Sequence, residues 1–174
     1  KRLNLLTKTD YAGNLIGIYK SKNKVAKKIM IGSHIDTVVT GGKFDGTVGV
    51  VSGLAIIKTL LENNYELPFD LEIYDYLGEE LNDWNISCIG SRAICGILSE
   101  ASLNRKNSNG DVLKDQINKL GGDTNKIGKI SNEFQKVIAC FELHIEQGTL
   151  LETNYVDIGI VQSMPNISRH KVSI

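Results

Sequence analysis

Three strand-length apolar segments of this chain each run directly into a short polar motif that carries histidine or carboxylate side chains. The three junctions are 27–33 with His34, 70–77 with Glu79 and Glu80, and 136–143 with His144. In open α/β sheets, sites form beyond the carboxyl ends of the strands. The sequence therefore predicts an α/β fold in which the strands deliver these side chains to one edge of a sheet.

The segments between these strands have the patterns of helices and turns. Over 46–63, apolar residues recur every three or four positions, which predicts an amphipathic helix. Further strands are predicted at 14–20 and 156–162, and further helices at 91–98 and 111–120. Strands that alternate with helices favour a mixed, mainly parallel sheet flanked by helices.

Composition restricts the class of protein. A chain of 174 residues that is 41% hydrophobic is long enough for one domain with a substantial core. Its net charge is +0 and its basic residues are scattered, which argues against nucleic acid or a membrane surface as a partner. Cys88, Cys95 and Cys140 form no CxxC pair, so we expect reduced packing residues in a cytoplasmic protein rather than nucleophiles.

The first polar motif combines His34, Asp36 and Asp45. A lone histidine after a strand is usually an ordinary polar residue, but residues i and i+2 of an extended segment share a face. The Asp36 carboxylate can therefore hold the His34 imidazole in one tautomer. Asp45 lies among glycines at the start of the predicted helix, where it could cap the helix, bridge two cations, or do both.

The later motifs leave similar alternatives open. Glu79 and Glu80 form a solvated acidic pair, or else one binds metal while its neighbour acts as a base. His144 is either a hydrogen-bonded core histidine or a ligand, and Gln147 offers a donor and an acceptor to a polar substrate. Imidazole and carboxylate ligands gathered at strand ends suit a dinuclear hydrolytic metal centre.

At these motifs the sequence resembles the amidase/hydantoinase/carbamoylase branch of the M20 metallopeptidase clan. This branch includes N-carbamoyl-L-amino-acid hydrolases, β-ureidopropionases and allantoate amidohydrolases. The resemblance is carried by the segments 32–38, 41–46, 78–80 with 90–93, and 142–148. The most specific motif is His-Ile-Glu-Gln-Gly, because peptidases of the same clan typically carry a carboxylate where this branch has the histidine.

The resemblance implies a zinc-peptidase-like catalytic domain with two divalent metal ions, either zinc or manganese, cobalt or nickel. By this resemblance, His34, Asp45 and His144 would hold one metal, and Asp45 would bridge to a second metal bound by Glu80. The remaining implied roles are Glu79 as the general base, Asp36 as the residue that orients His34, and Gln147 as a substrate contact.

The resemblance also implies an activity, namely hydrolysis of linear amide or ureido C–N bonds in a small molecule such as an N-carbamoyl amino acid. An M20 peptidase or aminoacylase, and a metal-binding fragment without catalysis, are the alternatives. Residues 1–167 would be a partial, truncated catalytic domain, and 168–174 would begin an inserted lid and dimerisation domain. We therefore expect a homodimer at full length and an inactive fragment.

Overall fold

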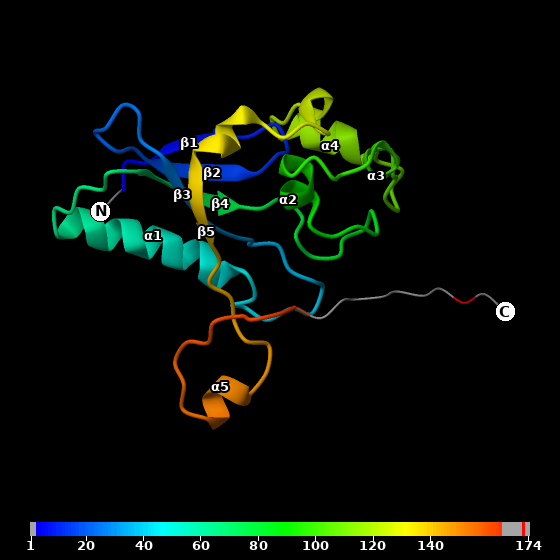
Figure 1. Ribbon diagram of the computed structural model, residues 1–174. Coiled ribbons are helices and arrows are strands. Elements are labelled where there is room, and N and C mark those ends of the chain that lie inside the picture. Colours follow the sequence, from blue (N-terminus) through cyan, green and yellow to red (C-terminus); the bar gives the residue numbers. More distant parts are fainter. Residues whose placement is uncertain (1–2, 165–171, 173–174) are drawn as a thin grey trace.

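The core of the computed structural model, which describes residues 3–164 and residue 172, is a five-stranded sheet of order β1-β2-β4-β3-β5 (Figure 1). The strands are β1 (Leu6–Thr9), β2 (Leu15–Tyr19), β3 (Lys28–Ser33), β4 (Asp70–Asp75) and β5 (Val137–Phe141). Strands β4, β3 and β5 run parallel, whereas β1 and β2 pair antiparallel with their neighbours. The α/β fold with a mixed sheet is therefore confirmed.

Helices lie on one face and at one end of this sheet, and α5 lies in a loop beyond it (Figure 1). They are α1 (Thr47–Glu62), α2 (Ile89–Ile94), α3 (Glu100–Leu103), α4 (Leu113–Lys119) and α5 (Leu150–Thr153), with 3-10 turns at Thr124–Lys126 and Asn132–Lys136. The long helix α1 runs along the sheet, while α2, α3 and α4 gather at one end (Figure 1). Within the described residues, we find no helix with the length and apolar character needed to cross a membrane.

Alternation along β3 and β4 sorts their side chains between the two faces of the sheet. Ile31 and Ile73 belong to the cluster that packs under α1 with Ile57, whereas Met30 and Tyr74 belong to the cluster on the opposite face. Both strands are thus buried on both sides, as central parallel strands are. This packing fixes the position of the strand ends, from which the polar motifs emerge.

A buried ion pair lies within the cluster opposite α1. Lys28 Nζ is 2.9 Å from Glu72 Oε1, and the Tyr74 hydroxyl donates to Glu72 Oε2 at 3.2 Å. The Glu72 carboxylate is almost fully buried, with a relative exposure of 1% for the residue. Burial, followed by the charge of Glu72, raises the pKa of Tyr74 well above its usual value. The buried Glu72 carboxylate is therefore satisfied by an ammonium group and a hydroxyl group.

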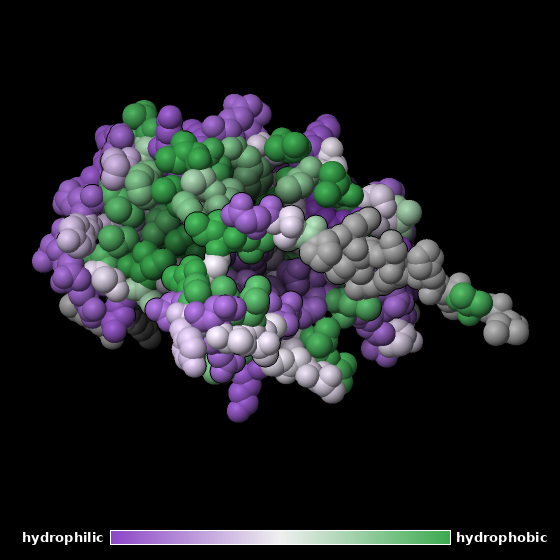
Figure 2. Space-filling model, turned by 60° about the horizontal axis from the view of Figure 1, so that its bottom comes forward, coloured by the Kyte–Doolittle hydropathy of each residue, from purple (hydrophilic) through white to green (hydrophobic). Residues whose placement is uncertain are grey.

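Strand β5 forms an edge of the sheet and carries exposed apolar side chains. Ile138 and Phe141 are 52% and 59% exposed. Beside them, an apolar groove of about 540 Å³ runs between α1 and the edge of the sheet, where Ile56, Leu60 and Leu143 contribute to its walls. Figure 2 shows a broad hydrophobic area on the left half of the molecule. Exposed apolar side chains therefore gather on this side of the sheet.

Two expectations about the elements need correction, and one strand was not expected. The segment 156–162 forms no strand, because a strand requires a neighbour's backbone hydrogen bonds and this segment pairs with no described strand. Strand β1 was not predicted, since its sequence Leu-Thr-Lys-Thr lacks a clear apolar pattern, and its pairing with β2 creates it. Helix α2 also lies earlier than the predicted 91–98. The predicted domain boundary between 167 and 168 lies outside the described residues.

Candidate metal centre

The polar motifs meet where the parallel strands end. His34 directly follows β3, Glu79 and Glu80 lie beyond the end of β4, and His144 lies beyond the end of β5. Because these three strands are parallel neighbours, their carboxyl ends share one edge of the sheet. Asp45 reaches the same edge from the segment that precedes α1. The topology therefore gathers residues that are more than a hundred positions apart in the sequence.

Three of these side chains form a compact cluster. His34, Asp45 and His144 each place one ligand atom within 4.8 Å of the other two. His144 Nε2 lies 3.2 Å from Asp45 Oδ1, and the two imidazole rings stack with their centroids 5.9 Å apart. The His34 side chain is 2% exposed, whereas that of His144 is 31% exposed, so the cluster is buried on one side and open on the other.

Backbone carbonyls orient both imidazoles. His34 Nδ1 lies 2.8 Å from the carbonyl oxygen of Asp36, and His144 Nδ1 lies 2.9 Å from that of Ile145. A carbonyl oxygen can only accept a hydrogen bond, so each Nδ1 carries a proton, and in the neutral tautomer each Nε2 then presents a lone pair. Two such lone pairs beside a carboxylate make the donor set that a divalent cation prefers. The residues present therefore fit a metal ion.

The carboxylate of Asp36 holds the acidic turn. Its Oδ1 and Oδ2 accept hydrogen bonds from the backbone N–H groups of Glu79 and Glu80 at 3.2 and 3.0 Å. The same Oδ1 is 3.5 Å from His34 Nδ1, which is a longer contact than that of the Asp36 carbonyl oxygen. Asp36 thus contacts the imidazole chiefly through its backbone, while its carboxylate positions the two glutamates.

Glu79 and Glu80 both interact with the cluster. Glu79 Oε2 is 3.5 Å from His34 Nε2, and Glu79 Oε1 accepts a hydrogen bond from the Cys88 thiol at 3.4 Å. Burial, followed by the negative charges of Glu79 and Asp45, raises the pKa of Glu80 above its usual value. Crowded carboxylates repel one another, and a cation between them would offset that repulsion.

Gln147 also reaches the cluster. Its side-chain amide donates to Asp45 Oδ1 and Oδ2 at 3.2 and 3.1 Å. Gln147, which is expected to contact substrate, is therefore hydrogen-bonded in this structure to Asp45, a candidate metal ligand. Its neighbour Glu146 faces away, because its carboxylate accepts the backbone N–H groups of Leu150 and Leu151 at the start of α5.

Asp75 escaped the sequence analysis, and so did the contact that Gly46 of the 41–46 motif makes with His34. Gly46 has a φ of 67°, and a Cβ at this position would lie 2.3–2.4 Å from the ring atoms of His34. Asp75 ends β4 and accepts the backbone N–H of Ile35 at 3.1 Å; burial is the main cause that raises its pKa. An acidic residue at the end of an apolar strand is a signal that could have drawn attention to Asp75, whereas the contact of Gly46 is a tertiary one.

We expect Gly46→Ala to lower metal affinity about 10–100-fold in the full-length protein, although it removes no ligand. The new Cβ would displace the His34 ring, and alanine is strained at this positive φ. Zinc titration by calorimetry would measure the effect. The matched control is Gly42→Ala in the same loop, where a Cβ would meet nothing within 4 Å. Equal affinities for the two variants would contradict the steric requirement.

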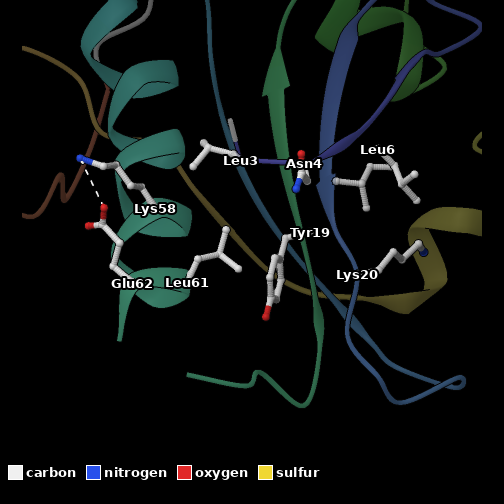
Figure 3. Close-up of a pocket in the computed structure, with 9 residues that line it drawn as sticks. Leu3, Asn4, Leu6, Tyr19, Lys20, Lys58, Leu61 and Glu62 are labelled. Carbon is white, nitrogen blue, oxygen red and sulfur yellow. Dashed lines mark ion pairs between the residues drawn. The ribbon is translucent and has the colours of Figure 1, made fainter. Parts of the chain in front are cut away.

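A cavity of about 440 Å³ lies away from this centre (Figure 3). It is bounded by β2 and by the last turns of α1, where Lys58 and Glu62 form an ion pair of 3.8 Å. Asp45 precedes the first turn of the same 16-residue helix, which is about 24 Å long. The cavity therefore has no part in the candidate metal centre.

Comparison with known proteins agrees with this geometry. The matching family model is that of Peptidase family M28, and it aligns with residues 14–148. The chain belongs to peptidase family M28. Family M28 shares its fold with the M20 clan, and the resemblance to the hydantoinase/carbamoylase branch is confirmed by the relatives of this M28 chain.

The N-carbamoyl-L-amino acid amidohydrolase of Geobacillus stearothermophilus is 32% identical over 174 residues, which are 100% of this chain and 42% of that protein. Allantoate deiminase of Arabidopsis thaliana is 30% identical, over 98% of this chain and 33% of that protein. A crystal structure of a hydantoinase/carbamoylase family amidase from Burkholderia ambifaria superposes with a TM-score of 0.76 at 31% identity, covering 88% of this chain and 36% of that one. The M28 chain thus spans less than half the length of these relatives.

Proposed function

We propose that the full-length protein is a metal-dependent hydrolase of linear amide or ureido C–N bonds, and that its substrate is an N-carbamoyl amino acid. The observation that carries this proposal is the convergence of His34, Asp45 and His144 beside the carboxylate of Glu79. The names of the relatives support the substrate class, since they include N-carbamoyl-L-amino acid amidohydrolases and hydantoinase/carbamoylase amidases.

The assignment of the metal ligands follows the donor atoms. His34, Asp45 and His144 would hold one divalent ion through two Nε2 atoms and a carboxylate oxygen. Asp45 would also bridge to a second ion held by Glu80, whose pKa is raised first by burial and then by the charges of Glu79 and Asp45. Nitrogen and oxygen ligands of this kind suit zinc, manganese, cobalt and nickel.

Bound divalent ions would lower the pKa of a water molecule and polarise the scissile carbonyl group. Glu79 would accept the proton of the attacking water and then deliver it to the leaving nitrogen. Asp36 would hold the Glu79 backbone during these steps, since it accepts that residue's N–H. Gln147 would exchange its contact with Asp45 for one with the substrate. The products from an N-carbamoyl amino acid would be the amino acid, carbon dioxide and ammonia.

The proposal extends to the organisation of the whole protein. Residues 1–167 would form part of the catalytic domain, and 168–174 would begin a lid and dimerisation domain. The relatives' greater length leaves room for such a domain. The full-length enzyme would then be a cytoplasmic homodimer that acts on a small molecule.

The experiment is an assay of the full-length protein with N-carbamoyl-L-amino acids, allantoate and dipeptides as parallel substrates. We expect hydrolysis of the N-carbamoyl amino acid, loss of activity after dialysis against a chelator, and recovery with added zinc, manganese, cobalt or nickel. Preferred hydrolysis of allantoate would shift the substrate class, as the allantoate deiminases among the relatives would suggest. Hydrolysis of dipeptides alone would make the protein a peptidase, and a metal-loaded protein without activity would reject the proposal.

A further inference from the structure

Cys88 contacts the candidate base directly. Its Sγ lies 3.4 Å from Glu79 Oε1, and its backbone N–H donates to the carbonyl oxygen of Glu79 at 2.8 Å. The thiol is half-buried, and the Glu79 side chain is 35% exposed. The proton on the thiol is the donor of this hydrogen bond, since a carboxylate oxygen can only accept. A residue expected from the sequence to be mere packing therefore touches the group proposed to move protons.

The backbone around Glu79 is held by other groups. The segment 88–90 donates three hydrogen bonds to the carbonyl oxygens of 77–79, at 2.8, 3.0 and 2.8 Å. The buried amide of Asn14 accepts the N–H of Leu77 at 2.9 Å, and Asp36 accepts the N–H of Glu79. These hydrogen bonds fix the backbone position of Glu79. They do not constrain the side-chain torsions that orient its carboxylate.

The carboxylate itself lies between two groups. One oxygen faces His34 Nε2, and the other accepts from the thiol of Cys88. Within the described part of the chain, the hydrogen bond that the Glu79 carboxylate accepts comes from the Cys88 thiol. A base that takes a proton from a water molecule beside His34 needs a free carboxylate oxygen on the His34 side. The thiol holds Oε1 on the Cys88 side, which leaves Oε2 facing His34.

The backbone places the thiol there at a cost. Cys88 has a φ of 55° and a ψ of 42°, immediately before α2. This left-handed conformation is uncommon for residues other than glycine, asparagine and aspartate. Glycine would fill the position with less strain, but it would supply no donor.

We propose that Cys88 is a positioning residue that orients the carboxylate of Glu79 for proton transfer. This inference rests on the proposed function. It makes Cys88 neither a nucleophile nor a metal ligand.

Kinetics of full-length variants test the inference. We expect Cys88→Ala and Cys88→Gly to lower kcat about 3–10-fold, the range for a weak hydrogen bond to a carboxylate, while KM and metal content stay unchanged. Cys88→Ser retains a donor and should restore most of the rate. The matched control is Cys95→Ala, which removes an exposed thiol at the other end of α2. Wild-type kcat in Cys88→Ala would overturn the inference. Wild-type kcat in Cys88→Gly, which relieves the backbone strain but supplies no donor, would overturn it as well.

A double-mutant cycle separates positioning from general structural damage. If Cys88 acts through Glu79, Cys88→Ala should change the residual rate less than about 2-fold in the Glu79→Gln background. The same fractional loss in both backgrounds would show that the thiol acts elsewhere, and would overturn the inference.

A readout without substrate distinguishes failure of this inference from failure of the proposed function. In the full-length protein, iodoacetamide should alkylate Cys88 roughly 3-fold faster or more after Glu79→Gln, because the amide removes the negative charge that disfavours the thiolate. Cys95 serves as the internal reference when the alkylated peptides are quantified. An unchanged Cys88 to Cys95 ratio would refute the contact, even if no substrate were hydrolysed.

Discussion

Glu79→Gln in the full-length protein is expected to lower turnover about 10²–10⁴-fold, the usual contribution of a general base, which is the role proposed for Glu79, and to leave the metal content near that of wild type. The amide preserves the shape of the side chain but cannot accept the proton of the attacking water. Metal binding should persist because His34, Asp45 and His144 form their cluster without a ligand atom from Glu79. Turnover of an N-carbamoyl amino acid and metal analysis of the purified variant measure both effects.

The neighbouring glutamate supplies the control. Glu80→Gln should lose metal first and activity as a consequence, so added metal should restore part of its rate, whereas added metal should not rescue Glu79→Gln. A solvated acidic pair would not give these opposite results. Full activity in a metal-loaded Glu79→Gln variant would show that Glu79 is not the base.

The second large effect concerns the core rather than the site. Glu72→Gln should lower the free energy of unfolding by about 1.5–3 kcal/mol, the range for a buried hydrogen bond to a charged group, because it neutralises a carboxylate that Lys28 meets at 2.9 Å in the interior. It also weakens the acceptor of the Tyr74 hydroxyl. Urea denaturation monitored by circular dichroism, with the midpoint and slope compared between variants, measures the change.

An exposed pair provides the matched control. Lys22 and Glu66 also form an ion pair, but their side chains are 82% and 65% exposed. Glu66→Gln should therefore cost no more than about 1 kcal/mol. Equal losses for Glu72→Gln and Glu66→Gln would show that burial does not determine the contribution of the inner pair.

Much of the candidate site could be predicted because short sequence patterns show both the strands and the polar residues that follow them. His34, Glu79 and His144 each follow an apolar strand, and parallel strands bring their ends together. The helix over 46–63 could be predicted from its apolar spacing, and its start determines where Asp45 lies. These inferences need only local periodicity and the general rule for α/β sheets. The roles of the individual residues await the experiments above.

Other features depend on partners that a local pattern cannot reveal. Residues 156–162 have the composition of a strand, but they form none, because a strand exists only beside another strand. The sequence also could not show that the Asp36 carboxylate binds the backbone of Glu79 and Glu80 more closely than the ring of His34.

The sequence by itself determined the α/β class, the order of the ligand-bearing motifs and the chemical nature of their side chains. These properties follow from apolar periodicity and residue identity, which the chain carries locally. Only the tertiary structure decided that Gly46 must leave room for the His34 ring and that the Cys88 thiol donates to Glu79. Such contacts depend on distances of a few ångströms between separate segments, and packing sets those distances.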